Sequence, residues 1–403
     1  MELNNPNISC LICKGPHHHS NCPMIAKARA YFKVKDTLSK ESFQGESPAP
    51  FVGRFGYPNI SVGILAPGEI HEDVWKFDAP RQWADENLGI NEVIGYRASL
   101  INSRFQANVK KIDAMIELSQ EVAMASKPAD IEFQLAQKPQ FTLSVHGDAA
   151  PTGPRANLKK ATITSNTKID SRVEKTVSDT DLYAKDALSY LYDKGFDENF
   201  LSRILSVGSL GLAKNRKLVP TRWSITATDD TLGKDLISEI KDYSIAEPLA
   251  YFGGYLGNHY LILVLPEVFS YELFEIYVPT GKYGTDYESY DGRKNYASNT
   301  VGGYYAARLA ILEKLKSIKR QGSILALRFI TDAYSTPLGV WVVREATRKS
   351  VSSKPLAFGD KNLMIEYAKK FSKKRFNYDL NQILKESKLF NQVRNQSKLN
   401  SFI

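Results

Sequence analysis

The chain has 403 residues, 43% of them hydrophobic and 24% charged, and it carries a net charge of +9. This composition excludes an intrinsically disordered chain, and the length exceeds what one ordinary hydrophobic core accommodates, so we expect two domains. The positive charge favours a polyanionic partner.

The sequence has no apolar run of about 18 residues or more, and its first ten residues lack the basic and apolar regions of a signal peptide. We therefore expect no membrane span, and we predict a cytoplasmic protein. Cysteine usage agrees with this, because all three cysteines lie within the first 22 residues and form no disulfide framework.

These cysteines have the spacing of a metal site. The Cys10-x-x-Cys13 turn lets two thiolates share one ion, and Cys22 supplies a third. One of the three consecutive histidines at 17–19 can complete a tetrahedron, which predicts a structural zinc knuckle over residues 1–25. The alternative is an unstructured tail with reduced thiols.

In the first half of the chain, hydrophobic periodicity and turn residues predict a mixture of helices and strands. We expect a Ser/Pro/Gly-rich link at 41–50, a turn-rich segment at 51–58 and a loop at 145–154. Helices are predicted at 26–40, 80–88, 92–100, 108–124, 180–194, 198–207 and 231–242. Strands are predicted at 59–66 and 223–227, with a strand pair at 131–135 and 140–145.

The second half alternates aromatic and aliphatic residues, which predicts an antiparallel meander of strands at 250–255, 260–265 and 273–278. Further strands are predicted at 324–331 and 339–344, and helices at 302–320, 360–374 and 378–388. Runs of strands and runs of helices favour an α+β fold. We expect an N-terminal domain over 26–245, a C-terminal domain with basic helices over 246–390, and a tail over 391–403.

The segment from 216 to 230 concentrates cations, hydroxyl groups, an indole and two carboxylates. Arg216, Lys217 and Arg222 are candidates for binding phosphates, and Trp223 is a candidate for stacking on a base. Trp223 is equally a candidate core residue. The carboxylates of Asp229 and Asp230 are candidates for metal binding or catalysis, with helix capping as the favoured alternative.

Other candidate groups lie in loops and near the C-terminus. His146 and Asp148 occupy a Gly/Pro loop after a predicted strand, and an enzyme would bring them together with Arg222, Asp229 and Asp230 in one cleft. Arg54 lies in a Gly-containing turn that could bring amides to an anion. No HExxH, GxxxxGK[ST] or GxSxG motif is present, so the enzyme question stays open.

The C-terminal region is basic. Residues 361–403 contain ten Lys or Arg residues against three acidic residues, and Lys373, Lys374 and Arg375 form its densest cluster. Such a face would attract phosphates in a salt-dependent manner, although a solvated helix face is an equal alternative.

The last eight residues have the spacing of a peptide that binds a sliding DNA clamp. The pattern is Gln396-x-x-Leu399-x-x-Phe402-Ile403. One turn of 3₁₀-helix would place the three apolar side chains on one side, suited to a hydrophobic pocket, and the glutamine amide could bond to the backbone at its rim. A frayed terminus is the alternative.

Several stretches together resemble the archaeal Nre family of DNA-repair proteins. The resemblance spans nearly the whole chain and is carried by CLICKG with a later Cys-Pro, PFVGRFGYP (50–58), GPRANLKKATITSN (153–166), RKLVPTRWSITATDD (216–230) and PLGVWVVREATR (337–348). The family pattern has four cysteines in the knuckle, and alignment from Cys22 places His17 where the third would be. His17 is therefore our choice for the fourth zinc ligand.

The resemblance implies participation in DNA-damage repair, docked on the sliding clamp PCNA, and it carries over no catalytic activity. From the residues and the resemblance together we predict a clamp-recruited protein that binds DNA through a basic surface. The alternatives are a repair enzyme that processes nucleic acid, bases or nucleotides, and a non-catalytic scaffold whose zinc knuckle docks another protein.

Overall fold

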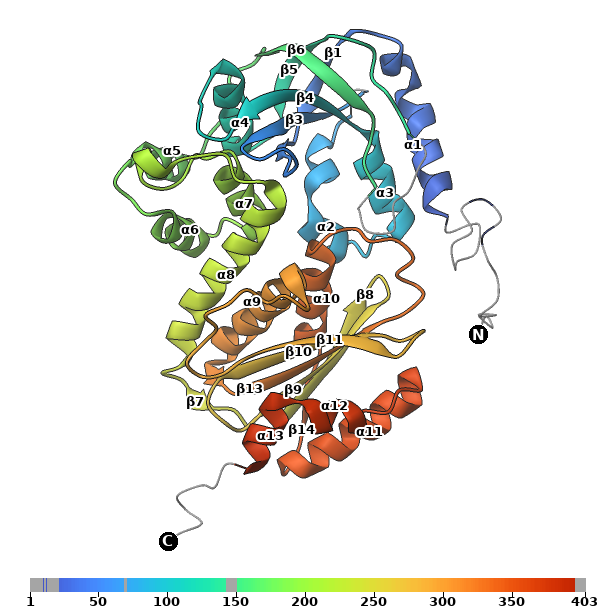
Figure 1. Ribbon diagram of the computed structural model, residues 1–403, viewed down its shortest axis with the longest axis vertical. Helices are drawn as coiled ribbons and strands as arrows, with labels where there is room; N and C mark the ends of the chain where they lie inside the picture. The colour runs from blue at the N-terminus through green and yellow to red at the C-terminus, as the bar shows by residue number, and fades with distance from the viewer. Residues whose placement is uncertain (1–9, 11, 13–21, 69–70, 143–150, 396–403) are drawn as a thin grey trace. The chain divides into compact units, whose positions relative to one another are not determined.

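The computed structural model describes residues 10, 12, 22–68, 71–142 and 151–395 (Figure 1). The chain divides into two compact units: unit 1 comprises Met1–Leu232 with Ser335–Gly339, and unit 2 comprises Gly233–Tyr334 with Val340–Ile403. The division falls inside helix α8 (Thr221–Ile240). Both units combine helices with largely antiparallel sheets, so the predicted α+β class is confirmed.

The strands of unit 1 are β1 (Ser42–Ser47), β2 (Ala49–Val52), β3 (Asn59–Pro67), β4 (Leu100–Asn108), β5 (Ala129–Leu135) and β6 (Arg155–Ile163). Its α-helices are α1 (Pro23–Leu38), α2 (Pro80–Asp85), α3 (Ile90–Ser99), α4 (Ala114–Met124), α5 (Ser171–Ser178), α6 (Ala184–Asp193), α7 (Glu198–Ser206) and the first part of α8. Short 3₁₀-helices are η2 (Val74–Asp78) and η3 (Ala213–Asn215).

The strands of unit 1 close into a barrel. Their order is β1-β5-β6-β4-β3-β2, and only Pro48 separates β1 from β2, so the two ends of this order are parts of one bent strand. β1 pairs with β5, and β2 pairs with β3. Gly45 in β1 passes so close to β3 that a Cβ there would lie 3.0 Å from the Pro67 carbonyl oxygen. A side chain at this crossing would hinder the closure.

Alternation along the strands fills the barrel. In β5, Ile131 and Phe133 are buried, whereas Glu132 and Gln134 between them are exposed, as the two-residue period of a strand requires. Helix α4 contributes Val122 to the same core. The Asp113 carboxylate accepts hydrogen bonds from the backbone N–H groups of Met115 and Ile116, both at 3.0 Å, and so caps α4.

The strands of unit 2 are β7 (Ser244–Ile245), β8 (Leu249–Tyr255), β9 (Asn258–Leu265), β10 (Ser270–Tyr277), β11 (Lys282–Glu288), β12 (Arg320–Gln321), β13 (Ser323–Ile330) and β14 (Leu356–Ala357). Its helices, besides the end of α8, are α9 (Val301–Ile318), α10 (Trp341–Ser352), α11 (Lys361–Phe376), α12 (Asn381–Glu386) and α13 (Lys388–Asn395).

Unit 2 is a three-layer arrangement. Its main sheet has the order β11-β10-β13-β9-β8-β14, in which β10 and β13 run parallel. Helices α9 and α10 cover one face, and α11, α12 and α13 cover the other (Figure 1). Because both faces are covered, β9 and β13 are buried almost throughout and read as continuous apolar runs rather than alternating ones. None of the helices in the described ranges combines the length and the hydrophobicity needed to cross a bilayer.

Two predicted strands are wrong, and both lie in helices. Residues 223–227 belong to α8, and residues 341–344 belong to α10. In α10 Trp341, Val342 and Val343 are all buried, so the run of large apolar residues reflects a helix buried on several sides rather than a strand. Asp229 lies inside α8, so its predicted role as a helix cap is also wrong.

Two predicted pairings are also wrong. β5 pairs with β1 and β6, and residue 140 makes only an isolated bridge with Arg155, so the predicted pair of 131–135 with 140–145 is not formed by the described residues. In unit 2, β13 lies between β9 and β10, which interrupts the predicted meander. Strands that are neighbours in the sequence usually pair, and nothing in the local sequence reveals that a later strand inserts between two earlier ones.

Candidate nucleic-acid interface

Three segments that are far apart in the sequence meet on unit 1. They are the β2–β3 connection at 53–58, the residues after β4 at 109–112, and the stretch 217–223 that enters α8. The backbone N–H of Val109 donates to the Pro58 carbonyl at 3.0 Å, and that of Leu218 donates to the Val109 carbonyl at 2.8 Å. The Val52 N–H donates to Thr221 Oγ1 at 2.9 Å. These bonds hold the three segments side by side.

Three aromatic rings on these segments are exposed. Phe55 is 81% exposed, Tyr57 46% and Trp223 48%. The Tyr57 and Trp223 ring centroids are 5.8 Å apart, and the Arg54 guanidinium lies 4.9 Å from the centroid of Phe55. Large apolar rings gathered on a surface usually mark a binding site, and rings flanked by arginine suit stacking on nucleobases.

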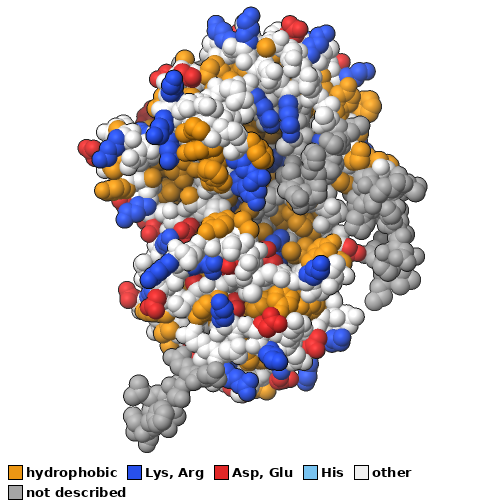
Figure 2. Space-filling model, viewed as in Figure 1, with side chains coloured by type: hydrophobic (Ala, Val, Ile, Leu, Met, Phe, Trp, Pro, Cys, Tyr) orange, Lys and Arg blue, Asp and Glu red, His pale blue; other side chains and the backbone are white. Residues whose placement is uncertain are grey.

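Cations lie on the same three segments as these rings. Arg54, Lys110, Lys111, Lys217 and Arg222 are all exposed. Within the described ranges none of the five forms an ion pair with an acidic side chain. Together with Phe55, Tyr57 and Trp223 they define what we call the aromatic–basic surface. Lys and Arg side chains interspersed with hydrophobic ones are also visible over the molecule in Figure 2. Such a combination favours phosphate groups at the cations and bases at the rings.

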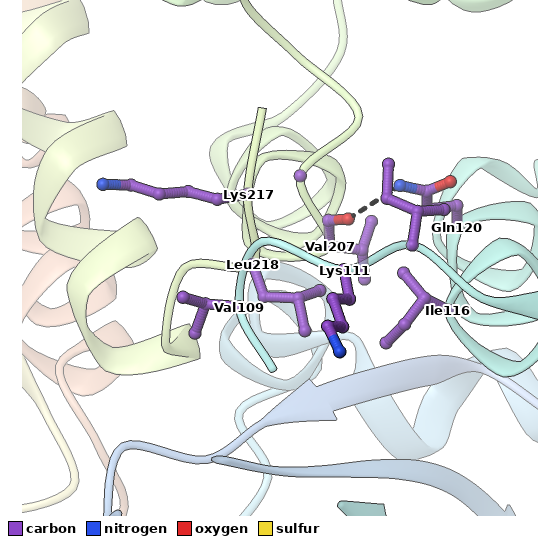
Figure 3. Close-up of a pocket in the computed structure, with 9 residues that line it drawn as sticks. Val109, Lys111, Ile116, Gln120, Val207, Lys217 and Leu218 are labelled. Atoms are coloured by element: carbon purple, nitrogen blue, oxygen red, sulfur yellow. Dashed lines mark hydrogen bonds between the residues drawn. The ribbon is translucent and has the colours of Figure 1, made fainter. Parts of the chain in front are cut away.

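The surface is open rather than a deep pocket. Beneath it lies a cavity of about 10 Å³ lined largely by apolar side chains, among them Val109, Ile116 and Leu218 (Figure 3). A cavity of this volume can hold about one water molecule. The Gln120 amide donates to the Val207 carbonyl at 3.0 Å beside it, and the Lys217 side chain extends away from the apolar lining. A ligand of nucleotide size would therefore bind on the outside of this region.

The predicted phosphate ligand Arg216 has a different environment from its neighbours. Its Nε donates to the Gly211 carbonyl at 2.8 Å, and its Nη2 donates to the carbonyls of Val177 and Asp179 at 2.8 and 2.9 Å. Burial lowers the pKa of this guanidinium, an effect partly opposed by the Asp179 carboxylate. Arg216 thus binds backbone carbonyls of two stretches, 177–179 and 211, and does not belong to the aromatic–basic surface.

The residues predicted for a catalytic cleft are not brought together within the described part of the chain. Asp229 is fully buried and Asp230 is partly buried in α8, whereas Arg222 is exposed two turns earlier. A rise of about 1.5 Å per residue places the Cα atoms of Arg222 and Asp229 about 10 Å apart along the helix. His146 and Asp148 lie outside the described residues.

The predicted zinc ligands are described in part. Cys10 and Cys22 are 1% and 0% exposed, and the Cys22 carbonyl accepts from the N–H groups of Ile25 and Ala26 at the start of α1. Cys13 and His17 lie outside the described residues, as do Gln396, Leu399, Phe402 and Ile403 of the predicted clamp peptide. Burial of both described thiols fits ligands of a closed structural site.

The basic cluster of Lys373, Lys374 and Arg375 is exposed in the last turn of α11 in unit 2. Cations at this end of a helix interact favourably with the helix dipole, which accounts for their position without a ligand. Arg375 also acts on His259 in β9: burial and then the Arg375 charge lower the pKa of that imidazole.

This shift predicts a pH dependence. The unfolded chain binds a proton at His259 near pH 6.5, whereas the folded chain binds it only at lower pH. The free energy of unfolding should therefore be highest above about pH 6.5 and should fall as the pH drops below that value. Urea denaturation at a series of pH values should show this slope in the wild type and a smaller slope in His259→Phe. Equal slopes would contradict the assignment.

Four members of the aromatic–basic surface were missed by the sequence analysis, namely Phe55, Tyr57, Lys110 and Lys111. A signal existed for the two rings, which occupy a Gly/Pro turn where no core needs them. Lys110 and Lys111 fell inside the helix predicted at 108–124, whereas in the structure they follow β4 and precede α4. The proximity of Tyr57 to Trp223 depends on contacts between segments more than 100 residues apart.

Family models match nearly the whole chain. "Archaeal Nre, N-terminal" covers residues 17–284, and "Archaeal Nre, C-terminal" covers residues 288–402. The DNA repair protein NreA of Haloferax volcanii is 38% identical over 334 residues, which span 78% of this chain and 80% of that protein. The DNA repair protein NreB of Archaeoglobus fulgidus is 34% identical over 402 residues, 97% and 99% of the two chains.

NreA of Archaeoglobus fulgidus is 36% identical over 368 residues, 87% of this chain and 90% of that protein. No solved structure matches this chain. Both family models and the full-length relatives agree with the resemblance that the motifs indicate, and the chain belongs to the archaeal Nre family.

Proposed function

We propose that this protein acts in DNA repair and binds DNA through the aromatic–basic surface of unit 1. The observation that carries the proposal is the meeting of three exposed rings with five cations that have no acidic partner among the described residues. The relatives are named DNA repair proteins, which supports DNA as the polyanion. The cations would neutralise phosphates, and the rings would stack on bases without reading their sequence.

The proposal is tested by replacing the two rings that come from different segments, Phe55 and Trp223. Loss of one stacked base costs about 1–3 kcal/mol, so Phe55→Ala/Trp223→Ala should weaken binding of a fluorescein-labelled oligonucleotide by about a hundredfold. Fluorescence anisotropy would measure the affinity. Tyr183→Ala is a matched control, because Tyr183 is 58% exposed on unit 1 but lies at the start of α6.

Wild-type DNA affinity in the double variant would show that the aromatic–basic surface does not bind DNA. Weakening by Tyr183→Ala to the same extent would have the same consequence, because it would show that any exposed ring contributes. Circular dichroism of each variant would confirm that the fold is retained.

We further propose that the protein is recruited by the sliding clamp PCNA through Gln396, Leu399, Phe402 and Ile403. The peptide directly follows α13, and α13 is fixed to the sheet of unit 2. The buried Glu272 carboxylate accepts from Ser387 Oγ at 2.5 Å and from the N–H groups of Lys388 and Leu389 at 3.1 Å. These bonds cap α13, so the peptide would extend from an anchored helix.

A structural zinc ion held by Cys10, Cys13, His17 and Cys22 is the third part of the proposal, supported by the burial of Cys10 and Cys22. Three thiolates and one imidazole would close a tetrahedral site and order the N-terminal segment. Cys10→Ser should lower the bound zinc, measured by atomic emission, from about one equivalent to well below one. A full zinc complement in this variant would show that Cys10 is not a ligand.

A further inference from the structure

The barrel of unit 1 has a specific connectivity. Counting β1 and β2 as one strand, the described strands occur in the chain as β1–β2, β3, β4, β5 and β6. Around the barrel β1–β2 pairs with both β3 and β5, and β6 lies between β5 and β4. β4 and β6 run parallel, and α4 lies between β4 and β5 in the chain. A Greek-key barrel of five strands in this order is the connectivity of the oligonucleotide-binding fold.

In that fold, ligands lie over the second and third strands, between the loop that joins strands one and two and the loop that joins strands four and five. The corresponding parts here are β3, β4, the connection at 53–58, and the described residues of the β5–β6 connection. The connection at 53–58 is the one that presents Phe55 and Tyr57. The barrel topology and the exposed rings are independent observations, and they indicate the same side of the barrel.

The outer face of β3 and β4 is suited to a polar, extended ligand. Inward residues of β3, such as Val62 and Ile64, are fully buried. On the outer side the Asn108 amide donates to the Asn59 side-chain oxygen at 2.8 Å, and the next outward residue of β4, Gln106, is exposed. Gly63 follows on the same face, opposite Arg104, and the Asn102 side chain from β4 covers it: a Cβ at Gly63 would collide with the Asn102 amide. These outward-facing residues form a row that runs along β3 and β4 from Asn59 and Asn108 to Gly63 and Arg104. The row begins next to the connection at 53–58, which belongs to the aromatic–basic surface.

The row leads to two arginines. With the Asn102 amide oxygen turned towards Arg104, it accepts from Nη2 at 3.1 Å and from Nε at 3.2 Å. Arg155 lies opposite Asn102 in the register of β6 with β4 and is exposed. Neither arginine forms an ion pair with an acid in the described ranges. Burial and then the Arg155 charge lower the pKa of Arg104. Two like charges held together favour an anion between them.

We propose that single-stranded DNA lies along the outer face of β3 and β4, from the aromatic–basic surface to a phosphate held by Arg104 and Arg155. This inference rests on the proposed function and specifies its substrate class. Gly63 lies four residues beyond Asn59, about 13 Å along the strand, which corresponds to about four nucleotides at a stacked spacing of 3.4 Å. Unpaired bases suit the rings, because the faces of paired bases in a duplex are already stacked.

The experiment measures anisotropy of labelled DNA against the full-length protein over a series of salt concentrations. The probes are a twelve-nucleotide single strand, a two-nucleotide strand, and the duplex of the longer one. The variant is Arg104→Gln/Arg155→Gln, and the charge control is Lys185→Gln, an exposed lysine on α6. Each lost phosphate contact should reduce the slope of log K against log salt by about 0.7, so the double variant, which loses the one phosphate that both arginines hold, should lose about 0.7.

We expect the wild type to bind the twelve-nucleotide strand at least tenfold more tightly than its duplex. The double variant should lose affinity and slope on the longer strand only, because a dinucleotide reaches the rings but not the arginines. Arg155→Gln alone should lose part of this slope, because Arg104 still contacts the phosphate. This single variant should fold normally, because the Arg155 side chain is exposed, and it therefore separates loss of phosphate binding from misfolding.

Unchanged slope and affinity in the double variant, or equal binding of duplex and single strand, would overturn the path over β3 and β4. In that case loss of binding in Phe55→Ala/Trp223→Ala would still support the proposed function. Failure of the wild type to bind any of the probes would overturn both.

Discussion

Leu399→Ala/Phe402→Ala should reduce the affinity of this protein for the host's sliding clamp by about a thousandfold. The spacing of Gln396-x-x-Leu399-x-x-Phe402-Ile403 would place the two replaced side chains in one hydrophobic pocket. Truncating an anchor residue that fills such a pocket typically costs about 2 kcal/mol or more, so two anchors together account for about 4 kcal/mol. Isothermal titration calorimetry of the purified chain with the clamp would measure the change.

Lys398→Ala provides the matched control, because it lies inside the peptide but outside the pattern. It should retain affinity within a few-fold. The double variant should also bind DNA as the wild type does, since the aromatic–basic surface is elsewhere in the chain. Retained clamp binding in the double variant would eliminate the peptide as the docking element.

Arg308→Met should lower the free energy of unfolding of unit 2 by about 3–5 kcal/mol. Arg308 Nη1 lies 2.8 Å from Glu288 Oε2, and their side chains are 2% and 1% exposed. The rings of Tyr304 and Tyr305 lie 5.7 and 5.4 Å from the guanidinium. Removing one partner of such a pair leaves a buried charge whose desolvation is no longer compensated, which accounts for the size of the loss.

Hydrogen exchange of unit 2 peptides in urea would measure this loss. Lys316→Met is the control, because Lys316 and Glu239 form a pair at 2.7 Å with side chains 42% and 40% exposed. Its loss should be below about 1 kcal/mol. Arg308→Met/Glu288→Leu should recover part of the stability, because no lone charge remains. Equal losses in Arg308→Met and Lys316→Met would show that burial of the first pair has no energetic consequence.

Helices and buried strands with a clear period were predictable from the sequence. The prediction of 59–66 as a strand matches β3, and that of 198–207 as a helix matches α7. Residues 223–227 were misassigned because Trp, Ile and Thr favour strands locally, and α8 forms through contacts that a local pattern does not contain. β1 and β2 were read as a link because Gly45, Pro48 and Pro50 are usual in turns. Here Pro48 lies at the bend between the two strands.

The candidate site was predictable in parts. Arg54, Lys217, Arg222 and Trp223 were named from local composition, and the structure places all four on the aromatic–basic surface. Their association was not predictable, because Val52 and Thr221 meet across 169 residues of sequence. Arg216 was indistinguishable from its neighbour Lys217 in the sequence. The structure distinguishes the two. The Arg216 guanidinium donates hydrogen bonds to three backbone carbonyls, whereas the Lys217 side chain is exposed to solvent.

The Arg308–Glu288 pair has a consequence for contacts between separate chains. Among the described strands, β11 is an outermost strand of the unit 2 sheet, and outermost strands offer backbone groups to which a foreign strand can bond. Asp286 and Glu288 place buried carboxylates on β11, held by Arg293 and Arg308. Inward-pointing charges on such a strand oppose edge-to-edge aggregation. Glu288, which neutralises the charge of Arg308, thus also opposes pairing of β11 with the edge strand of a second copy of this chain.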